Sequence, residues 1–298
     1  MALWITVALT AVRLAAIFIT PLELYPDEAQ YWLWSRTLDF GYYSKPPMVA
    51  WSIWATTLGG DSEPMVRLSA PLFQAATALG VFVLARRLYG AQIALAACAL
   101  YHVMPGVQLS SAVVATDAPL LACLTWALAL YVFLPQTEGR RRLVAAAGAG
   151  ALLGLAFLSK YAALYALIGV ALHLILDRDA RRIWSPPMIA AAVGAMLLVL
   201  APNLIWNAAH GFATVQHTAA NANWSPGNLF HPGEMLDFLV SQFGVFGPIP
   251  FAVLVAGAGL MAWRRRLTSA DLLLLCFTAP VFLIVTLQAL ISRANANW

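Results

Sequence analysis

The sequence predicts an all-α polytopic membrane protein, and three observations lead to this fold class. Of the 298 residues, 62% are hydrophobic and only 10% are charged, whereas a soluble domain carries about 25% charged residues. The mean hydropathy is +0.78, and the apolar residues recur in long runs of the length that a membrane-spanning helix needs. These runs do not alternate as the strands of a transmembrane barrel would.

About nine membrane helices are expected, at residues 2–20, 64–88, 91–110, 117–134, 143–159, 161–176, 187–206, 237–262 and 271–292. The first lacks a basic leader and carries Arg13 midway, so we interpret it as an uncleaved helix rather than a signal peptide. The fifth and sixth are short and meet at Lys160 without a loop, which is typical of helices that are tilted or packed inside a bundle. Small residues in the fifth helix, Gly148, Gly150 and Gly154, predict close helix packing.

The distribution of basic residues predicts the orientation of the chain. With the N-terminus inside, the inner segments hold Arg86, Arg87, Arg140, Arg141, Arg142, Arg178, Arg181, Arg182, Arg264, Arg265 and Arg266. The outer segments hold only Arg36, Lys45, Arg67, Lys160 and Arg293. This bias satisfies the positive-inside rule and places the longer segments, 21–63 and 207–236, outside. The net charge of +4 gives no indication of nucleic-acid binding.

The first outer segment is expected to contain two short interfacial helices. Pro26, Asp27 and Glu28 form a good helix start, with acids where the helix dipole favours them, and this helix would run to about Leu38. A second helix over 47–58 carries tryptophans and is too short to span, so it would lie along the membrane face. Neither outer segment is long enough for a separate domain with its own core.

Several polar residues are candidates for chemistry, each with a plainer alternative. Asp27 and Glu28, beside aromatic residues at the membrane boundary, can act as a base or orient a hydroxyl; otherwise they are exposed charges of a helix start. Lys45, before two prolines, suits a phosphate; otherwise its long side chain reaches lipid headgroups. Asp117 either belongs to a helix start capped by Thr116 or, with Lys160, forms a functional pair at membrane depth.

The histidines and cysteines give a weaker signal. His210, His217 and His231 lie in the second outer segment without a metal-binding spacing, and His102 is interpreted as a satisfied core histidine. Cys98, Cys123 and Cys276 lie in apolar runs and are expected to be buried hydrophobic side chains. No metal ligand set is predicted, and a divalent metal stays possible without support.

Four motifs in register resemble a known family. They are "PDEAQYW", "GYYSKPPMVAW", "VVATDAPLL" and "LLGLAFLSKY", and they resemble the family that contains lipid A aminoarabinose transferases, rhizobial galacturonosyltransferases and protein O-mannosyltransferases, which is similar to glycosyltransferase family 39. The resemblance covers most of residues 1–240. It implies a GT-C-type helical bundle and a polyprenyl-phosphate sugar as donor, with no nucleotide cofactor.

The resemblance also implies roles for individual residues. Asp27 would be the catalytic or acceptor-orienting carboxylate, and Lys45 would hold the donor phosphate. Asp117 matches the Thr-Asp element and Lys160 the Ser/Thr-Lys element. Independently of the family motifs, Glu28 and Asp117 join Asp27 as candidate catalytic carboxylates, and Lys160 and Arg36 join Lys45 as candidate phosphate-binding cations. Tyr31, Tyr42 and Tyr43 are candidate substrate contacts.

The sequence departs from this family in two places. Aminoarabinose transferases have a glutamate implicated in metal contact directly before the loop lysine, and Ser44 occupies that place here. Family members usually continue with further helices, so residues 1–298 are expected to be a single GT-C-type module that is incomplete at its C-terminus.

The expected function is transfer of a sugar to a lipid, glycan or protein hydroxyl on the periplasmic face of a bacterial inner membrane. Two alternatives stay open. A transporter or flippase for an anionic lipid-linked substrate would also use Asp117 and Lys160 within the membrane, although no inverted repeat is visible. A truncated, non-catalytic relative would bind the lipid only.

Overall fold

The protein is described by a computed structural model that covers residues 1–221, 229–264 and 267–292, and the regular structure of this part is helical throughout. The helices are α1 (Ala2–Ile19), α2 (Pro26–Ser35), α3 (Met48–Thr57), α4 (Glu63–Arg67), α5 (Ser69–Tyr89), α6 (Ala91–Val103), α7 (Pro105–Ala112), α8 (Asp117–Phe133), α9 (Gly139–Ser159), α10 (Leu164–Leu176), α11 (Arg178–Ile183), α12 (Pro186–Ala209), α13 (Ala213–Asn221), α14 (Pro232–Phe246), α15 (Pro248–Trp263) and α16 (Ser269–Ile291). Short 3-10 turns follow α8 (Leu134–Gln136) and precede α10 (Tyr161–Ala163). Three arginines that contribute to the predicted orientation, Arg265, Arg266 and Arg293, lie outside the described residues.

The chain is a multi-pass membrane protein, although the expected count of nine spans is not confirmed. Among the described residues, six helices are long and apolar enough to cross a membrane, or up to eight if each of two bent pairs is one span. The expected sixth span is only the short apolar helix Tyr161–Leu176.

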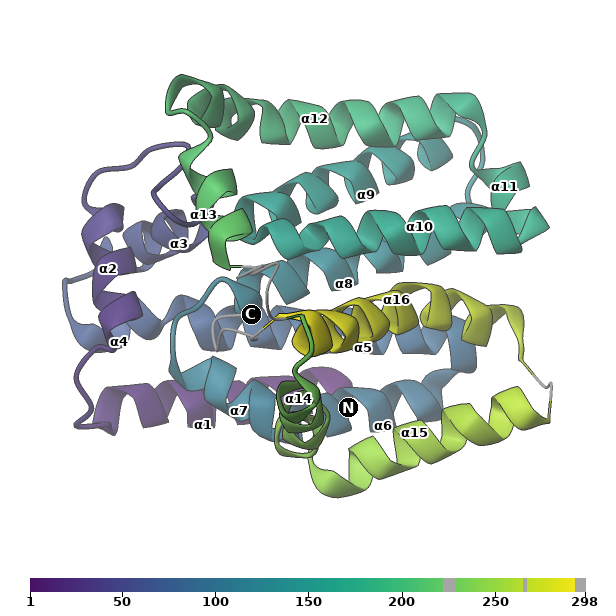
Figure 1. The fold of residues 1–298 in the computed structure, drawn as a ribbon, viewed down its shortest axis with the longest axis horizontal. Coiled ribbons are helices and arrows are strands. Elements are labelled where there is room, and N and C mark those ends of the chain that lie inside the picture. The colour runs from purple at the N-terminus through teal and green to yellow at the C-terminus, as the bar shows by residue number, and fades with distance from the viewer. Residues whose placement is uncertain (222–228, 265–266, 293–298) are drawn as a thin grey trace.

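The two bent pairs have identifiable causes in the sequence. Residues 91–110 bend by 57° between α6 and α7, where Pro105 cannot continue the hydrogen-bonding pattern of a helix. The expected helix 237–262 is two helices, α14 and α15, that meet at 113°. Gly247 has φ 90° and is followed by Pro248, a combination that ends a helix. Figure 1 accordingly shows α14 end-on, while α15 lies in the plane of the view.

The long helices lie side by side along the longest axis, and the two ends of this bundle differ in character (Figure 1). The interfacial helices α2, α3 and α4 and the second-segment helix α13 gather at one end, which we call the loop end. The opposite end carries the close of α5 with Arg86 and Arg87, the start of α9 with its three arginines, and α11. The arginines of α5, α9 and α11 thus lie at the end of the bundle opposite to the loop end.

Close packing of α9 on α12 depends on glycine, as the sequence predicts. A Cβ atom added at Gly150 would lie 1.9 Å from the Ala192 carbonyl oxygen, and one at Gly154 would lie 2.9 Å from the Met196 carbonyl oxygen. Because backbone atoms cannot move aside, only glycine allows the two helices to approach this closely. This pair supports the segment around Lys160, which directly follows α9.

The two interfacial helices expected in segment 21–63 are present as α2 and α3, and α2 ends at Ser35 rather than near Leu38. Tyr31, Val49, Ile53, Val66 and Val114 form a buried cluster that joins these helices to α4 and to the segment before α8. The loop after α2 also packs on the C-terminal part of α12, which carries Trp206. The indole of Trp206 donates to Asp39 (2.7 Å), and its ring lies so close to Gly41 that a Cβ there would be 2.3 Å from it.

Candidate active site

The pairing of Asp117 with Lys160 predicted from the sequence is confirmed. Asp117 is the first residue of α8, and Lys160 lies at the break after α9, where its backbone is extended (φ −159°, ψ 136°). The Lys160 ammonium donates to the Asp117 carboxylate at 2.9 Å. The alternative of a helix start is also met in part: Thr116 occupies the N-cap position and Asp117 lies in the first turn, but the Thr116 side chain makes no capping hydrogen bond.

Asp27 and Lys45 lie within electrostatic reach of this pair. The pKa of Lys45 is lowered from its ordinary value by burial and by the positive charge of Lys160, and is partly restored by the carboxylates of Asp27 and Asp117. The Lys45 side chain is half-buried, and the Asp27 side chain is exposed in the first turn of α2. Neither makes a hydrogen bond or ion pair within the described part of the chain. A partly desolvated ammonium and a free carboxylate thus converge at one place, available to a ligand.

Tyr31 is a buried residue of the core that lies near the carboxylates of Asp27 and Asp117. Its ring belongs to the buried cluster of the loop end and is only 4% exposed. Its pKa is raised, first by burial and then by the negative charges of Asp27 and Asp117. The phenol therefore remains protonated near the carboxylates, while the ring itself is covered by its neighbours.

Glu28 has a different role from the expected catalytic one. Its side chain is fully buried and its carboxylate accepts hydrogen bonds from Arg67 Nη2 (2.8 Å) and from the backbone nitrogens of Val114 (2.9 Å) and Tyr25 (3.0 Å). A carboxylate whose oxygens are used in this way cannot reach a substrate. Glu28 is consequently a structural partner of the neighbouring Asp27 rather than a second reacting group.

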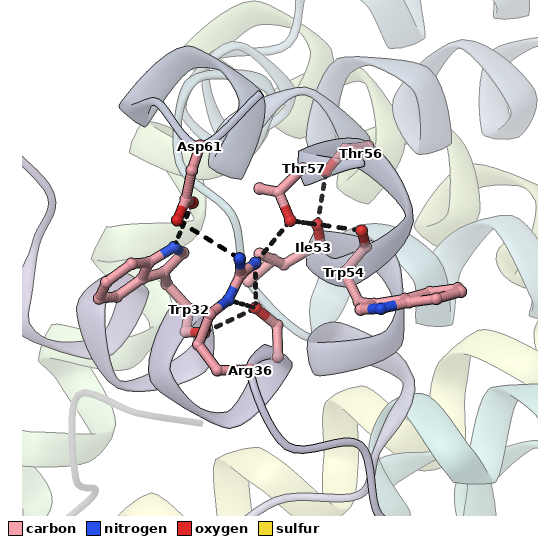
Figure 2. Close-up of polar contacts among 8 residues, drawn as sticks. Trp32, Arg36, Ile53, Trp54, Thr56, Thr57 and Asp61 are labelled. Atoms are coloured by element: carbon pink, nitrogen blue, oxygen red, sulfur yellow. Dashed lines mark hydrogen bonds and ion pairs between the residues drawn. The ribbon is translucent and has the colours of Figure 1, made fainter. Parts of the chain in front are cut away.

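Arg36 is also engaged elsewhere, as Figure 2 shows. Its guanidinium donates to Thr57 Oγ1 (2.5 Å), pairs with Asp61 (3.4 Å) and lies over the ring of Trp32. Trp32 itself donates to Asp61 at 2.7 Å. This network fastens α2 to α3 and to the turn before α4, so the geometry does not support the expected phosphate contact by Arg36.

The two remaining tyrosines differ in their environment. Tyr42 is buried, stacks on Trp34, and donates its hydroxyl to the Thr37 carbonyl (3.0 Å), which makes it a support of the loop rather than the expected substrate contact. Tyr43 is 64% exposed and meets His217 of α13, with 3.3 Å between its hydroxyl and Nδ1. Of the two, Tyr43 is the one that can still contact a ligand.

No group of three or more His, Cys, Asp or Glu that could hold a metal ion is found in residues 1–221, 229–264 and 267–292. His102 is buried as expected, and it contacts Arg13 and Thr6.

The four charged residues of the site, Asp27, Lys45, Asp117 and Lys160, can do acid–base and electrostatic work. The carboxylates can accept a proton or orient a hydroxyl, and the ammonium groups can hold an anion.

Two buried residues that support the site were not singled out from the sequence. From the sequence, Arg67 contributes only to the charge of the outer side, and Asn203 falls within the expected membrane helix 187–206. Arg67 binds Glu28, while Asn203 donates to the Phe40 carbonyl at 2.7 Å and accepts from the Tyr161 hydroxyl at 3.0 Å. A polar residue within or beside an apolar run is a functional candidate by default, and that signal could have identified both.

Comparison with known proteins agrees with this description. The profile of the family described as dolichyl-phosphate-mannose-protein mannosyltransferase matches residues 44–206. The chain is 40% identical, over 99% of its length, to the lipid A galacturonosyltransferase RgtD of Rhizobium johnstonii (strain DSM 114642 / LMG 32736 / 3841). It spans 62% of the length of that relative.

Solved structures show the same fold. Crystal structures of ArnT from Cupriavidus metallidurans match with a TM-score of 0.76 both in the apo state and bound to undecaprenyl phosphate, at 19% and 20% identity. The matches cover 94% and 98% of this chain, and 54% and 56% of those chains. An oligosaccharyltransferase from Archaeoglobus fulgidus, in complex with Zn and sulfate, matches with a TM-score of 0.56 at 16% identity, over 97% of this chain and 47% of that one.

The helical bundle, its interfacial helices and the charged site at their junction define a membrane protein of the GT-C class. More particularly, the chain belongs to the dolichyl-phosphate-mannose-protein mannosyltransferase family. The resemblance drawn from the four sequence motifs is confirmed.

Proposed function

We propose that the chain is a membrane glycosyltransferase that moves one sugar from a polyprenyl-phosphate donor to an acceptor hydroxyl. The observation that carries this proposal is the convergence of Asp27, Lys45, Asp117 and Lys160. These residues come from four separate segments, yet they lie together at the loop end of the bundle. A lipid-linked phosphosugar needs a cation for its phosphate and a base for the attacking hydroxyl, and the ammonium groups and carboxylates of this site can supply both.

The reaction follows from the charges. Asp27 accepts or orients the proton of the acceptor hydroxyl, whose oxygen attacks the anomeric carbon and forms the new glycosidic bond. The bond between this carbon and the phosphate oxygen breaks, and the polyprenyl phosphate leaves with the bonding electrons. Lys45 and Lys160 stabilise the negative charge that grows on the departing phosphate. Asp117 holds Lys160 in place through the contact at 2.9 Å.

The relatives support a more specific assignment of substrates. RgtD is a lipid A galacturonosyltransferase, and one ArnT structure contains undecaprenyl phosphate. We infer that the donor lipid is a polyprenyl phosphate of this kind, that the sugar is galacturonic acid, and that the acceptor is lipid A. Other acceptors, such as a glycan or a protein hydroxyl, are outcomes of the test below.

The direct test uses the purified chain in lipid nanodiscs with a polyprenyl phosphate that carries labelled galacturonic acid. With lipid A present, we expect label on lipid A and release of one free polyprenyl phosphate for each sugar transferred. A flippase would move the intact labelled lipid between leaflets without release. A non-catalytic relative would bind the lipid and do neither, and either result would contradict the proposal.

We propose further that the site faces the periplasm across a bacterial inner membrane. The basis is the separation of the arginines of α5, α9 and α11 from the loop end. A reporter fused after Arg142 should report cytoplasm, and one inserted after Gly60, in the exposed turn before α4, should report periplasm. Opposite signals would reverse the orientation and move the site to the other compartment.

The lowered pKa of Lys45 predicts how donor binding depends on pH. An ammonium with a lowered pKa loses its charge at a lower pH than a free lysine, whose pKa is about 10.4. Binding of polyprenyl phosphate should therefore weaken as pH rises, and this loss should begin below the pH range in which a free lysine loses its charge. Titrations at alkaline pH, where the phosphate itself stays ionised, measure this loss of affinity. In Lys45→Arg this loss of affinity should move to higher pH, because arginine stays charged. If the loss occurs at the same pH as in the wild type, the titrating group is not Lys45.

A further inference from the structure

Two buried polar side chains, Glu28 and Asn203, form hydrogen bonds between the chain segments that carry the charged residues of the site. Glu28 lies directly after Asp27, and its carboxylate accepts from the backbone nitrogen of Val114, three residues before Asp117. Asn203 lies on α12, where its amide donates to the carbonyl of Phe40, in the loop that leads to Lys45, and its oxygen accepts from the hydroxyl of Tyr161.

The connection through Glu28 is tight. Arg67 holds its two oxygens at 3.0 and 2.8 Å, and also donates to the carbonyls of Leu22 (2.9 Å) and Glu23 (2.8 Å). Glu28 is 0% exposed and Arg67 3% exposed, so the pair is shielded from water and competing ions. The ion pair thus joins the chain before α2, α2 itself, α4 and the entry to α8. It leaves little freedom in the position of Asp27 relative to Asp117.

The connection through Asn203 concerns the two lysines. Tyr161 directly follows Lys160, so its hydrogen bond to Asn203 fixes the break between α9 and α10. Phe40 is tied to Lys45 through a turn in which the Tyr42 nitrogen donates to the Lys45 carbonyl at 3.2 Å. Asn203 is only 1% exposed. One amide therefore spans the two backbone segments that carry Lys45 and Lys160.

We propose that Glu28 and Asn203 are positioning residues for two different pairs of charged groups. Glu28 fixes the position of Asp27 relative to Asp117, and Asn203 fixes the position of Lys45 relative to Lys160. The inference rests on the proposed function. Its consequence is that disturbing Glu28 slows the chemical step while the donor phosphate still binds, whereas disturbing Asn203 weakens the binding of that phosphate. A residue that only stabilised the fold would alter both quantities together.

The experiment compares Glu28→Asp with Asn203→Leu. Glu28→Asp keeps the charge that Arg67 needs but withdraws the carboxylate by one methylene, so it cannot reach both Arg67 and Val114. Since a displacement of about 1 Å can cost roughly 100-fold in rate, we expect kcat at saturating donor to fall by about 10- to 100-fold. Affinity for a short-chain polyprenyl phosphate, measured by titration, should change much less than kcat, because Lys45 is untouched and Lys160 keeps its contact with Asp117 at 2.9 Å.

Asn203→Leu removes the hydrogen bonds to Phe40 and from Tyr161, together with a longer one from Asn207 (3.4 Å), with little change in volume. We expect the affinity for polyprenyl phosphate to fall by about tenfold, the effect of losing roughly one well-placed charge-assisted contact. We expect kcat at saturating donor to fall by less, because the lysines hold the phosphate before the reaction as well as during it. Gln74→Leu is the matched control, because Gln74 is fully buried and bonded to Ser110 and Tyr101 away from the site. It should change neither quantity by more than about twofold.

Each outcome decides the inference. Equal changes of kcat and affinity in both variants, or no change in either, would overturn it. If Glu28→Asp does not insert stably, the double variant Glu28→Gln with Arg67→Gln removes both buried charges together and allows the same comparison. If the wild-type chain transfers no sugar, the proposed function fails and the Glu28 half of the inference fails with it, whereas the titration of Asn203→Leu still decides the other half.

Discussion

Asp27→Asn is expected to reduce sugar transfer by about 10²- to 10⁴-fold, the usual cost of losing a positioned general base. The change is nearly isosteric and removes only the negative charge and the basicity. Asp27 is exposed in the first turn of α2 and has no hydrogen bond or ion pair within the described residues, so the fold should tolerate the change. The measurement is the rate of release of polyprenyl phosphate from a labelled donor by purified, inserted protein.

Asp61→Asn provides a matched control for this result. Asp61 is another carboxylate of the first segment, but it binds Trp32 and Arg36 instead of facing the charged site. Its replacement should leave the rate within a few-fold of the wild type. Near-normal turnover in Asp27→Asn would show that Asp27 is only the charge of a helix start, and the search for a base would then turn to Asp117.

The helical membrane fold was predictable because its cause is local. An apolar run in a bilayer must satisfy its own backbone hydrogen bonds, so composition and run length alone indicate a helix. The number of spans was less predictable, because it depends on where helices break. Gly247 and Pro248 produce a 113° bend in a run that reads as one span. Pro105 produces a smaller bend, at which Arg13 donates to the His102 carbonyl exposed by the break (2.7 Å).

The site was predictable only in part, for a similar reason. Residue type and position indicated that Asp117 and Lys160 would pair, since two opposite charges at membrane depth stabilise each other. The neighbouring carboxylates Asp27 and Glu28 look alike in the sequence, yet one is exposed and the other is fully buried. They differ because Glu28 binds Arg67, a partner 39 positions away in the chain. No local sequence pattern predicts such a contact.

Lys45→Met is expected to weaken the binding of polyprenyl phosphate by roughly ten- to a hundredfold. Methionine keeps an apolar stem of similar length and deletes the charge. If Lys45 only reached lipid headgroups, the affinity would barely change. If it holds the donor phosphate, the loss of a charge-assisted hydrogen bond costs about 1.5–3 kcal/mol, which corresponds to the stated loss of affinity. The half-buried ammonium, without a hydrogen-bond partner in the described part of the chain, favours the second result.

Two further variants make this result specific to Lys45. Lys45→Arg should recover part of the affinity but not all of it, because a planar guanidinium does not replace a compact ammonium. Arg36→Met deletes a cation of the same segment whose donors are used by Ser35, Thr57 and Asp61, so it should leave the affinity unchanged. The measurement is titration of purified variants with a short-chain polyprenyl phosphate at fixed salt and pH. Unchanged affinity in Lys45→Met would remove this residue from the site and leave Lys160 as the lysine that binds the phosphate.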